Sequence, residues 1–235
     1  MDSARRLCSR SNYSSSDDGS GFALSGLEAS AGFSGKRALP AEASTSEEYP
    51  NPMGREDGAV NGMSQYAGLR DPRFVAIHRG GLLDVASHHL LASWAADCAE
   101  HVLPLFTARY PEDDRPRRAI ETARAWSRGE ASVGKAREAA FAAHAAARSA
   151  SDAAAREAAR AAGHAVATVH MADHELGAAA YAIRAVRLAS PESDAMTAGE
   201  RECRWQRAQL PPAIRELVLS DEERRNKKTW SVFNC

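Results

Sequence analysis

Apolar positions in the second part of the chain recur every three or four residues, which is the spacing of one face of an α-helix. In the first such segment, one stripe carries both apolar and polar side chains: Leu90, Trp94, Asp97 and His101. Asp84 is placed to cap this helix, and Pro104 is expected to kink or end it. The pattern therefore predicts a helix from Val85 to Leu103.

Capping residues, glycines and prolines divide the remainder into further helical segments. The predicted segments are 115–128, 133–148, an alanine-rich stretch that begins after Ser151, 198–209, and a final stretch that begins at Pro212. From the pattern alone, the alanine-rich stretch either runs unbroken to Ala189 or restarts near Asp173. Ordinary helix lengths favour a restart, with Asp173 as the cap of the new helix.

Alanine dominates the middle of the chain, where it fills 29 of the 71 positions from 119 to 189. Its helix propensity is the highest of all residues, but its methyl group buries little area, so alanine-lined helices must approach closely to form a core. Close antiparallel packing is the expected result. The predicted fold class is all-α, a compact bundle of about five to seven alanine-rich helices.

Residues 1–70 differ in composition from everything that follows. They are rich in Ser, Gly, Asp, Glu and Pro, and their apolar patches, FALSGL and AGF, are short. Such a segment cannot bury enough apolar surface to offset the entropy cost of ordering it. The sequence therefore predicts a disordered tail over residues 1–70 and an all-helical domain over residues 71–235, which opens with a short extended piece around Val75.

Charge and hydropathy argue against two classes of partner. The net charge of −1 gives the chain no global field that would attract nucleic acid, and local basic runs such as Arg224–Lys228 are interpreted as solvated helix ends. No stretch approaches the roughly 20 apolar residues of a membrane-spanning helix. We therefore expect neither a nucleic-acid partner nor a membrane partner.

The four cysteines, Cys8, Cys98, Cys203 and Cys235, are far apart in the sequence and contain no CxxC pair. This spacing favours a reducing compartment, and Cys98 is expected to be an ordinary buried thiol. The N-terminus has no apolar segment of the kind found in secretory signals. The predicted location is the cytoplasm.

Two residue pairs have the spacing that lets two side chains of one helix bind a single metal ion: Asp97 with His101, and His170 with His174. Asp173 lies beside the second pair, so these five residues form the candidate polar cluster. Zinc would suit nitrogen and carboxylate ligands. Histidines that pair with a carboxylate or a carbonyl are far more common than metal ligands, so we predict no metal and no cofactor.

Motifs for nucleophilic catalysis and nucleotide binding do not occur in the sequence. There is no GxSxG, P-loop or GxGxxG, and HMADH lacks the Glu of an HExxH protease motif. His144 and His164, within the alanine-rich region, are interpreted as polar members of helix contacts. We therefore assign no catalytic residues, and a binding protein is more expected than an enzyme.

Five long, ordered blocks carry a resemblance to a known family: SWAADCAEHVLPLF (93–106), ARYPEDDRPRRAIETARAWSRGE (108–130), AAFAAHAAARSA (139–150), REAARAAGHAVATVHMADHELGAAAYAIRAV (156–186) and RWQRAQLPPAIRELVL (204–219). From about Arg73 to Leu219 the chain resembles the Imm-5-like family, whose members are assigned as immunity partners of bacterial toxins. The resemblance implies a toxin as protein partner and supplies no catalytic residues. The near-neutral charge departs from the acidic surfaces expected of inhibitors of basic nucleases.

Three functions remain open from the sequence. The resemblance implies an immunity protein that neutralises a toxin by stoichiometric protein–protein binding. The alternative is a metal-dependent enzyme with an interhelical His/Asp site, and the third is a purely structural helical scaffold. If Asp97, His101 and His170 point together into one cavity, a ligand pocket gains support; if they pair singly, binding through the outer surface is favoured.

Overall fold

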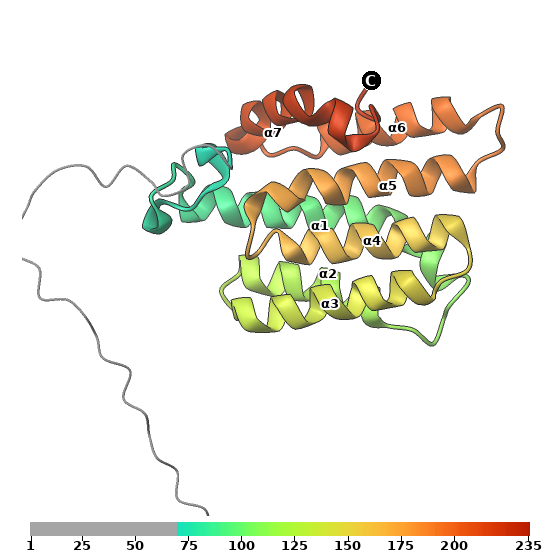
Figure 1. The fold of residues 1–235 in the computed structure, drawn as a ribbon, viewed down its shortest axis with the longest axis horizontal. Helices are drawn as coiled ribbons and strands as arrows, with labels where there is room; N and C mark the ends of the chain where they lie inside the picture. The colour runs from blue at the N-terminus through green and yellow to red at the C-terminus, as the bar shows by residue number, and fades with distance from the viewer. Residues whose placement is uncertain (1–69) are drawn as a thin grey trace, which may run out of the picture. The chain divides into compact units, whose positions relative to one another are not determined.

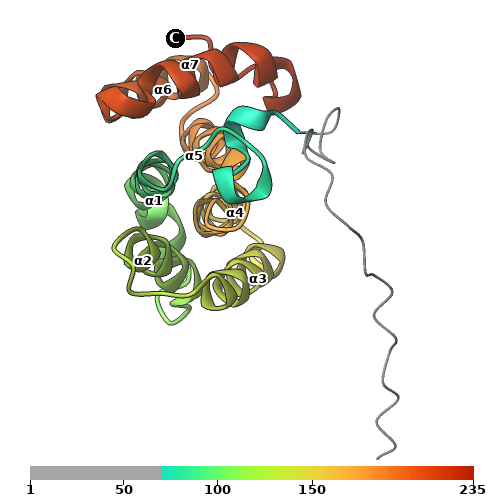
Figure 2. The same ribbon diagram turned by 90° about the vertical axis from the view of Figure 1, so that its left-hand side faces the viewer.

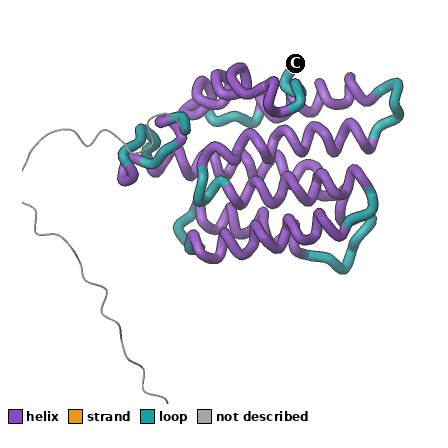
Figure 3. The backbone as a smooth tube through the Cα atoms, viewed as in Figure 1, coloured by secondary structure: helices purple, strands orange, loops and turns teal. Residues whose placement is uncertain are grey.

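A computed structural model describes residues 70–235, and its regular elements are helices (Figures 1 and 3). The disordered tail predicted for residues 1–70 lies outside the described residues, except for Arg70. The described residues contain seven α-helices: α1 (Val85–Thr107), α2 (Arg115–Ser127), α3 (Val133–Ser149), α4 (Ala153–Ala167), α5 (Glu175–Ala189), α6 (Ala195–Ala208) and α7 (Pro212–Arg225). The same residues contain four 3-10 helices: η1 (Pro72–Phe74) and η2 (Ile77–Arg79) before α1, η3 (Ala172–His174) between α4 and α5, and η4 (Asn226–Thr229) after α7. The predicted all-α bundle is confirmed.

The helices form three tiers, which Figure 2 shows end-on. Helices α6 and α7 make one outer tier, α1, α4 and α5 the middle tier, and α2 and α3 the other outer tier. Consecutive helices from α1 to α6 alternate in direction (Figure 1). Helix α4 is central, because it packs against α1, α2, α3 and α5. Because the helices alternate in direction, the connection between α4 and α5 lies at one end of the bundle, beside the start of α1.

Alanine forms most of the larger core cluster, which fills the space between α1, α2, α3, α4 and α5. Ala96, Ala143, Ala158 and Ala162, from three of these helices, are fully buried. A second cluster between the middle tier and the α6–α7 tier contains larger side chains such as Trp94. Small side chains thus let the middle helices approach closely, as the composition predicts.

Two predicted helix ends need correction. Pro104 does not end the first helix, because α1 continues through it to Thr107. Proline removes one backbone donor from the helix, but Phe106 is buried in the last turn, so packing offsets that loss. Asp152 caps α4 by accepting from the amide of Ala155 at 2.8 Å, so the expectation that Ser151 is the cap is wrong.

The alanine-rich stretch restarts, as helix lengths favoured. Helix α4 ends at Ala167, η3 follows, and α5 begins at Glu175. The predicted cap of the new helix is wrong, because the carboxylate of Asp173 accepts a hydrogen bond from Arg70 at 2.8 Å and does not cap α5. A long-range ion pair thus replaces the local capping interaction.

The segment before α1 is extended at Val75 and Ala76, as expected around Val75, and on either side of these residues it turns back on itself. It consists of η1 and η2, with Ala76 and Leu83 joined in an isolated bridge. Gly81 packs so closely on this segment that a Cβ at position 81 would lie 1.9 Å from the carbonyl oxygen of Val75. The glycine therefore fixes the segment in a tight, well-defined turn.

Cys98 is a free, fully buried thiol, as predicted. Cys203 and Cys235 form a disulfide with their Cα atoms 6.1 Å apart, although 32 positions separate them in the chain. Their distance in the sequence did not predict whether they pair. The chain after α7 folds back and buries Phe233 in the second core cluster, which brings Cys235 to Cys203. The spacing of the cysteines therefore no longer supports a reducing compartment. None of the helices within residues 70–235 is long and apolar enough to cross a membrane.

Candidate functional site

The five residues of the candidate polar cluster fall into two separate places. Asp97 and His101 lie in the second half of α1, whereas His170, Asp173 and His174 lie in the connection between α4 and α5. That connection is fixed beside the start of α1, because His88 Nε2 donates to the carbonyl of Thr168 at 2.7 Å. Asp97 is nine residues further along α1, or about 14 Å along the helix axis. His170 and His174 therefore do not share one helix, as their spacing suggested, and the two predicted pairs lie at different heights along the bundle.

Asp97 and His101 each bridge α1 to another helix. Asp97 pairs with Arg124 of α2 at 2.8 Å, while burial raises the pKa of its carboxyl group. His101 Nδ1 lies 2.8 Å from the buried carboxylate of Glu202, and its ring stacks on Trp205 with centroids 3.7 Å apart. These side chains pair singly with partners on α2 and α6, which accounts for polar groups on an otherwise apolar stripe.

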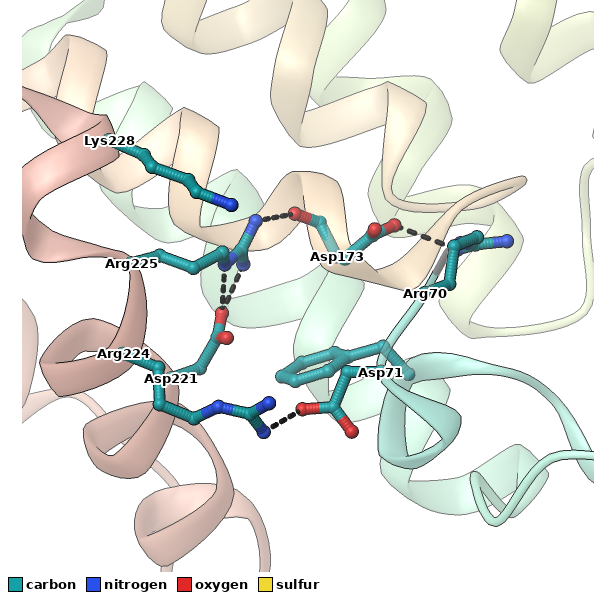
Figure 4. Close-up of a pocket in the computed structure, with 8 residues that line it drawn as sticks. Arg70, Asp71, Asp173, Asp221, Arg224, Arg225 and Lys228 are labelled. Carbon is teal, nitrogen blue, oxygen red and sulfur yellow. Dashed lines mark hydrogen bonds and ion pairs between the residues drawn. The ribbon is translucent and has the colours of Figure 1, made fainter. Parts of the chain in front are cut away.

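Asp173 lines a polar cavity of about 330 Å³ between the segment before α1, η3 and α7 (Figure 4). We call it the ion-pair pocket; it is lined by Arg70, Asp71, Phe74, Asp173, Asp221, Arg224, Arg225 and Lys228. Its charged groups pair with one another: Arg70 with Asp173 at 2.8 Å, Arg224 with Asp71, and Arg225 with Asp221. Lys228 alone among them has no ion-pair partner in the part of the chain that the structure describes.

Arg225 holds the deepest part of this network together. It donates to Asp221 at 2.6 Å, to the buried carboxyl of Glu175 at 3.0 Å, and to the carbonyl of Asp173 at 2.8 Å. The interpretation of the basic run Arg224–Lys228 as a solvated helix end is therefore wrong for Arg225, which is largely enclosed. Its role is to fasten α7 to the start of α5, and the sequence offers no local signal for that long-range contact.

His174 belongs to a row of three histidines, His144 of α3, His164 of α4 and His174 of η3, which we call the histidine row. The ring centroids of His144 and His164 are 5.2 Å apart, and those of His164 and His174 are 5.1 Å apart. His164 Nδ1 lies 3.2 Å from His174 Nδ1, so one of the two nitrogens donates to the other. Burial, with His174 and His144 adding to it, lowers the pKa of His164 to about 3. The row is therefore built around a neutral imidazole at pH 7.

Glycine makes room for this row. A Cβ at Gly177 would lie 2.6 Å from His164 Nδ1, closer than real contacts allow. We expect Gly177→Ala to lower the free energy of unfolding by about 1–3 kcal/mol, because the buried His164 ring must shift. Gly134→Ala is the control: its new methyl would lie 3.7 Å from Ser132 Oγ, so helix propensity should stabilise that variant by about 0.5–1 kcal/mol. Urea unfolding of both variants measures the difference, and equal effects would contradict this role of Gly177.

His170 lies next to the histidine row, with its ring centroid 5.7 Å from that of His174, and it lines a second, smaller pocket at the same end of the bundle. Its Nδ1 is buried and makes no hydrogen bond within residues 70–235. Burial lowers the pKa of His170, and the nearby Arg137, Arg70 and Arg79 lower it further. His170 and His174 thus lie close together, whereas the carboxylate of Asp173 pairs with Arg70 in the ion-pair pocket.

Metal binding finds little support in this geometry. Among residues 70–235, no group of three or more His, Cys, Asp or Glu side chains is arranged to hold a metal ion. His164 and His174 bring two nitrogens together, but a hydrogen bond explains their 3.2 Å separation. The sequence interpretation of His144 and His164 as helix contacts agrees with their positions. Arg70 and Arg225 were missed because their partners Asp173 and Glu175 lie far away in sequence.

Comparison with known families supports the resemblance seen in the sequence. A family model matches residues 81–213, which is more than half of the chain and covers α1 to α6. Comparisons with curated proteins and with solved structures gave no match. The match includes Asp97, His101 and the whole α4–α5 connection, whereas most of the ion-pair pocket lies outside it. The chain belongs to the family described as Imm-5 like putative immunity protein.

Proposed function

We propose that the protein neutralises a bacterial toxin by stoichiometric binding and that it does so without catalysis. Family membership supplies the class of partner. Binding through the surface is supported by three exposed apolar side chains, Ile77, Leu82 and Val85, which are 60%, 69% and 65% exposed. Apolar side chains grouped on a surface are typical of protein interfaces.

These three residues, which we call the apolar end face, lie within nine consecutive positions. The backbone holds them in place: the amide of Ile77 donates to the carbonyl of Leu83 at 3.0 Å, and the amide of Leu83 donates to the carbonyl of Val75 at 2.9 Å. Buried Leu83 anchors the turn to the core. A surface that is already ordered loses little conformational entropy on binding, so more of the contact energy appears as affinity.

The charged groups of the ion-pair pocket support the same proposal. Arg70, Asp173, Arg225 and Asp221 are engaged with one another, so they are poorly placed to act as free acids, bases or nucleophiles. Their paired arrangement stiffens the same end of the bundle that carries the apolar end face. A rigid end with exposed anchors fits an inhibitor that covers a toxin surface.

The test is to co-express the protein with the toxin encoded beside its gene. The wild-type chain should restore growth and co-elute with the toxin at a constant ratio. Leu82→Asp should weaken binding by at least about tenfold, since a charge replaces an exposed apolar contact. Leu188→Asp is the matched control, because Leu188 is 51% exposed at the far end of α5. Failure of the wild-type chain to bind any neighbouring toxin would overturn the proposal.

The metal-dependent enzyme is the weaker candidate. It would need Asp97 and His101 to act with the α4–α5 connection, from which they are separated by about 14 Å and about 20 Å along α1. Elemental analysis of untagged protein, together with unfolding in the presence of a chelator, tests it. Stoichiometric zinc, with loss of stability on chelation, would favour this candidate over the binding protein.

We also propose that the protein acts in the cytoplasm, where it would meet a toxin before export. The Cys203–Cys235 disulfide makes this testable, because reducing compartments keep such thiols reduced. Thiol labelling in intact cells should find both cysteines reduced, and the disulfide should form only after purification. A quantitative disulfide in freshly lysed, thiol-blocked cells would contradict a cytoplasmic location.

A further inference from the structure

We infer that the small pocket beside His170 receives a carboxylate side chain of the toxin, an inference that rests on the proposed function. This end pocket has a volume of about 110 Å³. Its ionisable lining residues are all basic: Arg70, His78, Arg79, His88 and His170. The apolar end face begins within the same segment, since Ile77 stands between two of the pocket's lining residues, Ala76 and His78.

Two buried polar atoms of the end pocket make no hydrogen bond within residues 70–235. They are Nε of Arg70 and Nδ1 of His170. Arg70 uses only its Nη2 to bind Asp173, so its Nε–H remains a donor without an acceptor. A buried donor without an acceptor costs free energy, and an incoming carboxylate oxygen would remove that cost. The second donor becomes available when His170 carries its proton on Nδ1.

The surrounding elements add positive charge and little negative charge. Arg137 of α3 lies near His170 and helps to lower its pKa, after burial as the main cause. Arg79 and His78 of η2 and His89 of α1 act in the same way on the pKa of His88, again after burial. Asp173 is the acid that acts on His170, and Arg70 already pairs with it. An anion is therefore the charge type that this pocket favours.

The walls of the end pocket favour a carboxylate on an alkyl stem over a free inorganic anion. Val75, Trp126, Val133 and Val169 line it beside the basic groups. Apolar walls can pack against the methylene groups of a Glu or Asp side chain, whereas phosphate would lose hydration there without gaining contacts. The apolar end face would then contact the toxin around the inserted carboxylate. The kind of partner that fits is a toxin surface with an acidic residue surrounded by apolar ones.

A direct test uses N-acetyl-glutamate N-methylamide as the probe and follows the Cε1–H signal of His170 by NMR as a function of pH. The glutamate probe should shift this signal saturably and move the titration of His170 to higher pH, because a nearby anion stabilises the imidazolium. N-acetyl-glutamine N-methylamide should have no such effect. An equal response to the glutamine probe, or a response to inorganic phosphate without one to the glutamate probe, would overturn the inference.

The second arm measures toxin binding by exposed-residue variants. Arg79→Gln should weaken binding and Arg79→Glu should weaken it further, by at least about tenfold, since a reversed charge repels the carboxylate. Arg201→Glu, an exposed position on α6, is the matched control and should bind as the wild type does. If the wild-type chain binds the toxin and Arg79→Glu binds equally well, the inference is wrong and the proposed function stands. If the wild-type chain does not bind, the proposed function fails, and the probe titration still decides whether the pocket takes a carboxylate.

Discussion

Replacing Arg225 with methionine is expected to lower the free energy of unfolding by about 3–5 kcal/mol at pH 8. The substitution keeps most of the side-chain volume but removes the cation that binds Glu175 and Asp221. Glu175 is 0% exposed, so its carboxyl group would have no solvent to replace the lost partner. A buried carboxylate that loses its cation is among the most destabilising changes that one substitution can make.

The size of this effect should depend on pH in a defined direction. Burial raises the pKa of Glu175 well above the ordinary 4.5, despite the opposing Arg225. The folded state therefore holds this proton more tightly than the unfolded state, and the stability it contributes is lost as pH rises through the folded-state pKa. Arg225→Met should accordingly be less damaging at pH 5 than at pH 8, because protonation of Glu175 removes one of the two buried charges that Arg225 pairs with.

Urea unfolding at pH 5 and pH 8 measures both effects. The matched control is Arg128→Met, since Arg128 pairs with Glu130 in an ion pair in which both side chains are 57% exposed. Exposed pairs contribute little, so the control should unfold as the wild type does. Equal stability of the Arg225 and Arg128 variants would show that the buried network does not fasten α7 to α5.

Replacing His164 with glutamine is expected to remove a large part of the acid sensitivity of the fold. The pKa of His164 is lowered from 6.5 to about 3, mainly because the ring is buried. Between these values the unfolded state binds a proton that the folded state does not, so stability is complete above pH 6.5 and falls as the pH decreases. The loss from this one group is about 1.4 kcal/mol for each pH unit within that window.

The measurement is the free energy of unfolding at pH 7, 6, 5 and 4 for the wild type and two variants. The difference between the wild type and His164→Gln should change by about 1.4 kcal/mol per pH unit between pH 6 and pH 4. Comparing the two removes the contributions of ionisable groups that do not interact with His164. Gly134→Ala provides the control variant, since it removes no ionisable group and its curve should run parallel to that of the wild type. Parallel curves for all three proteins would rule out His164 as the source of acid sensitivity.

The two predictions together describe how the chain uses polar groups inside an alanine-rich bundle. Alanine methyl groups leave the middle helices close together but supply little contact area for each residue. The histidine row and the Arg225 network occupy the places where α5 meets α4 and α7. Such groups fix one arrangement of helices whose apolar faces are otherwise alike, which is a benefit in specificity more than in net stability.

Spacing along the chain was enough to predict the helices, because backbone hydrogen bonds within a helix join residues four positions apart. The same spacing left the restart between α4 and α5 open, and ordinary helix lengths favoured it. The cap at Asp152 and the passage of α1 through Pro104 were missed, since there the local signals compete with one another or with packing. The family resemblance was carried by long ordered blocks and needed no tertiary information.

Only the tertiary structure decided which polar groups meet. His101 pairs with Glu202, which is 101 positions away, and Arg225 pairs with Glu175, which is 50 positions away. The end pocket likewise joins Arg70, His88 and His170 from three distant segments. Helix faces made largely of alanine are nearly identical from one helical turn to the next. The sequence therefore determines that the helices pack, but it does not determine how far each helix is shifted along the bundle axis relative to its neighbours. The position of each helix along the bundle axis keeps the pairs Asp97–His101 and His170–His174 apart and brings the residues of the basic end pocket together.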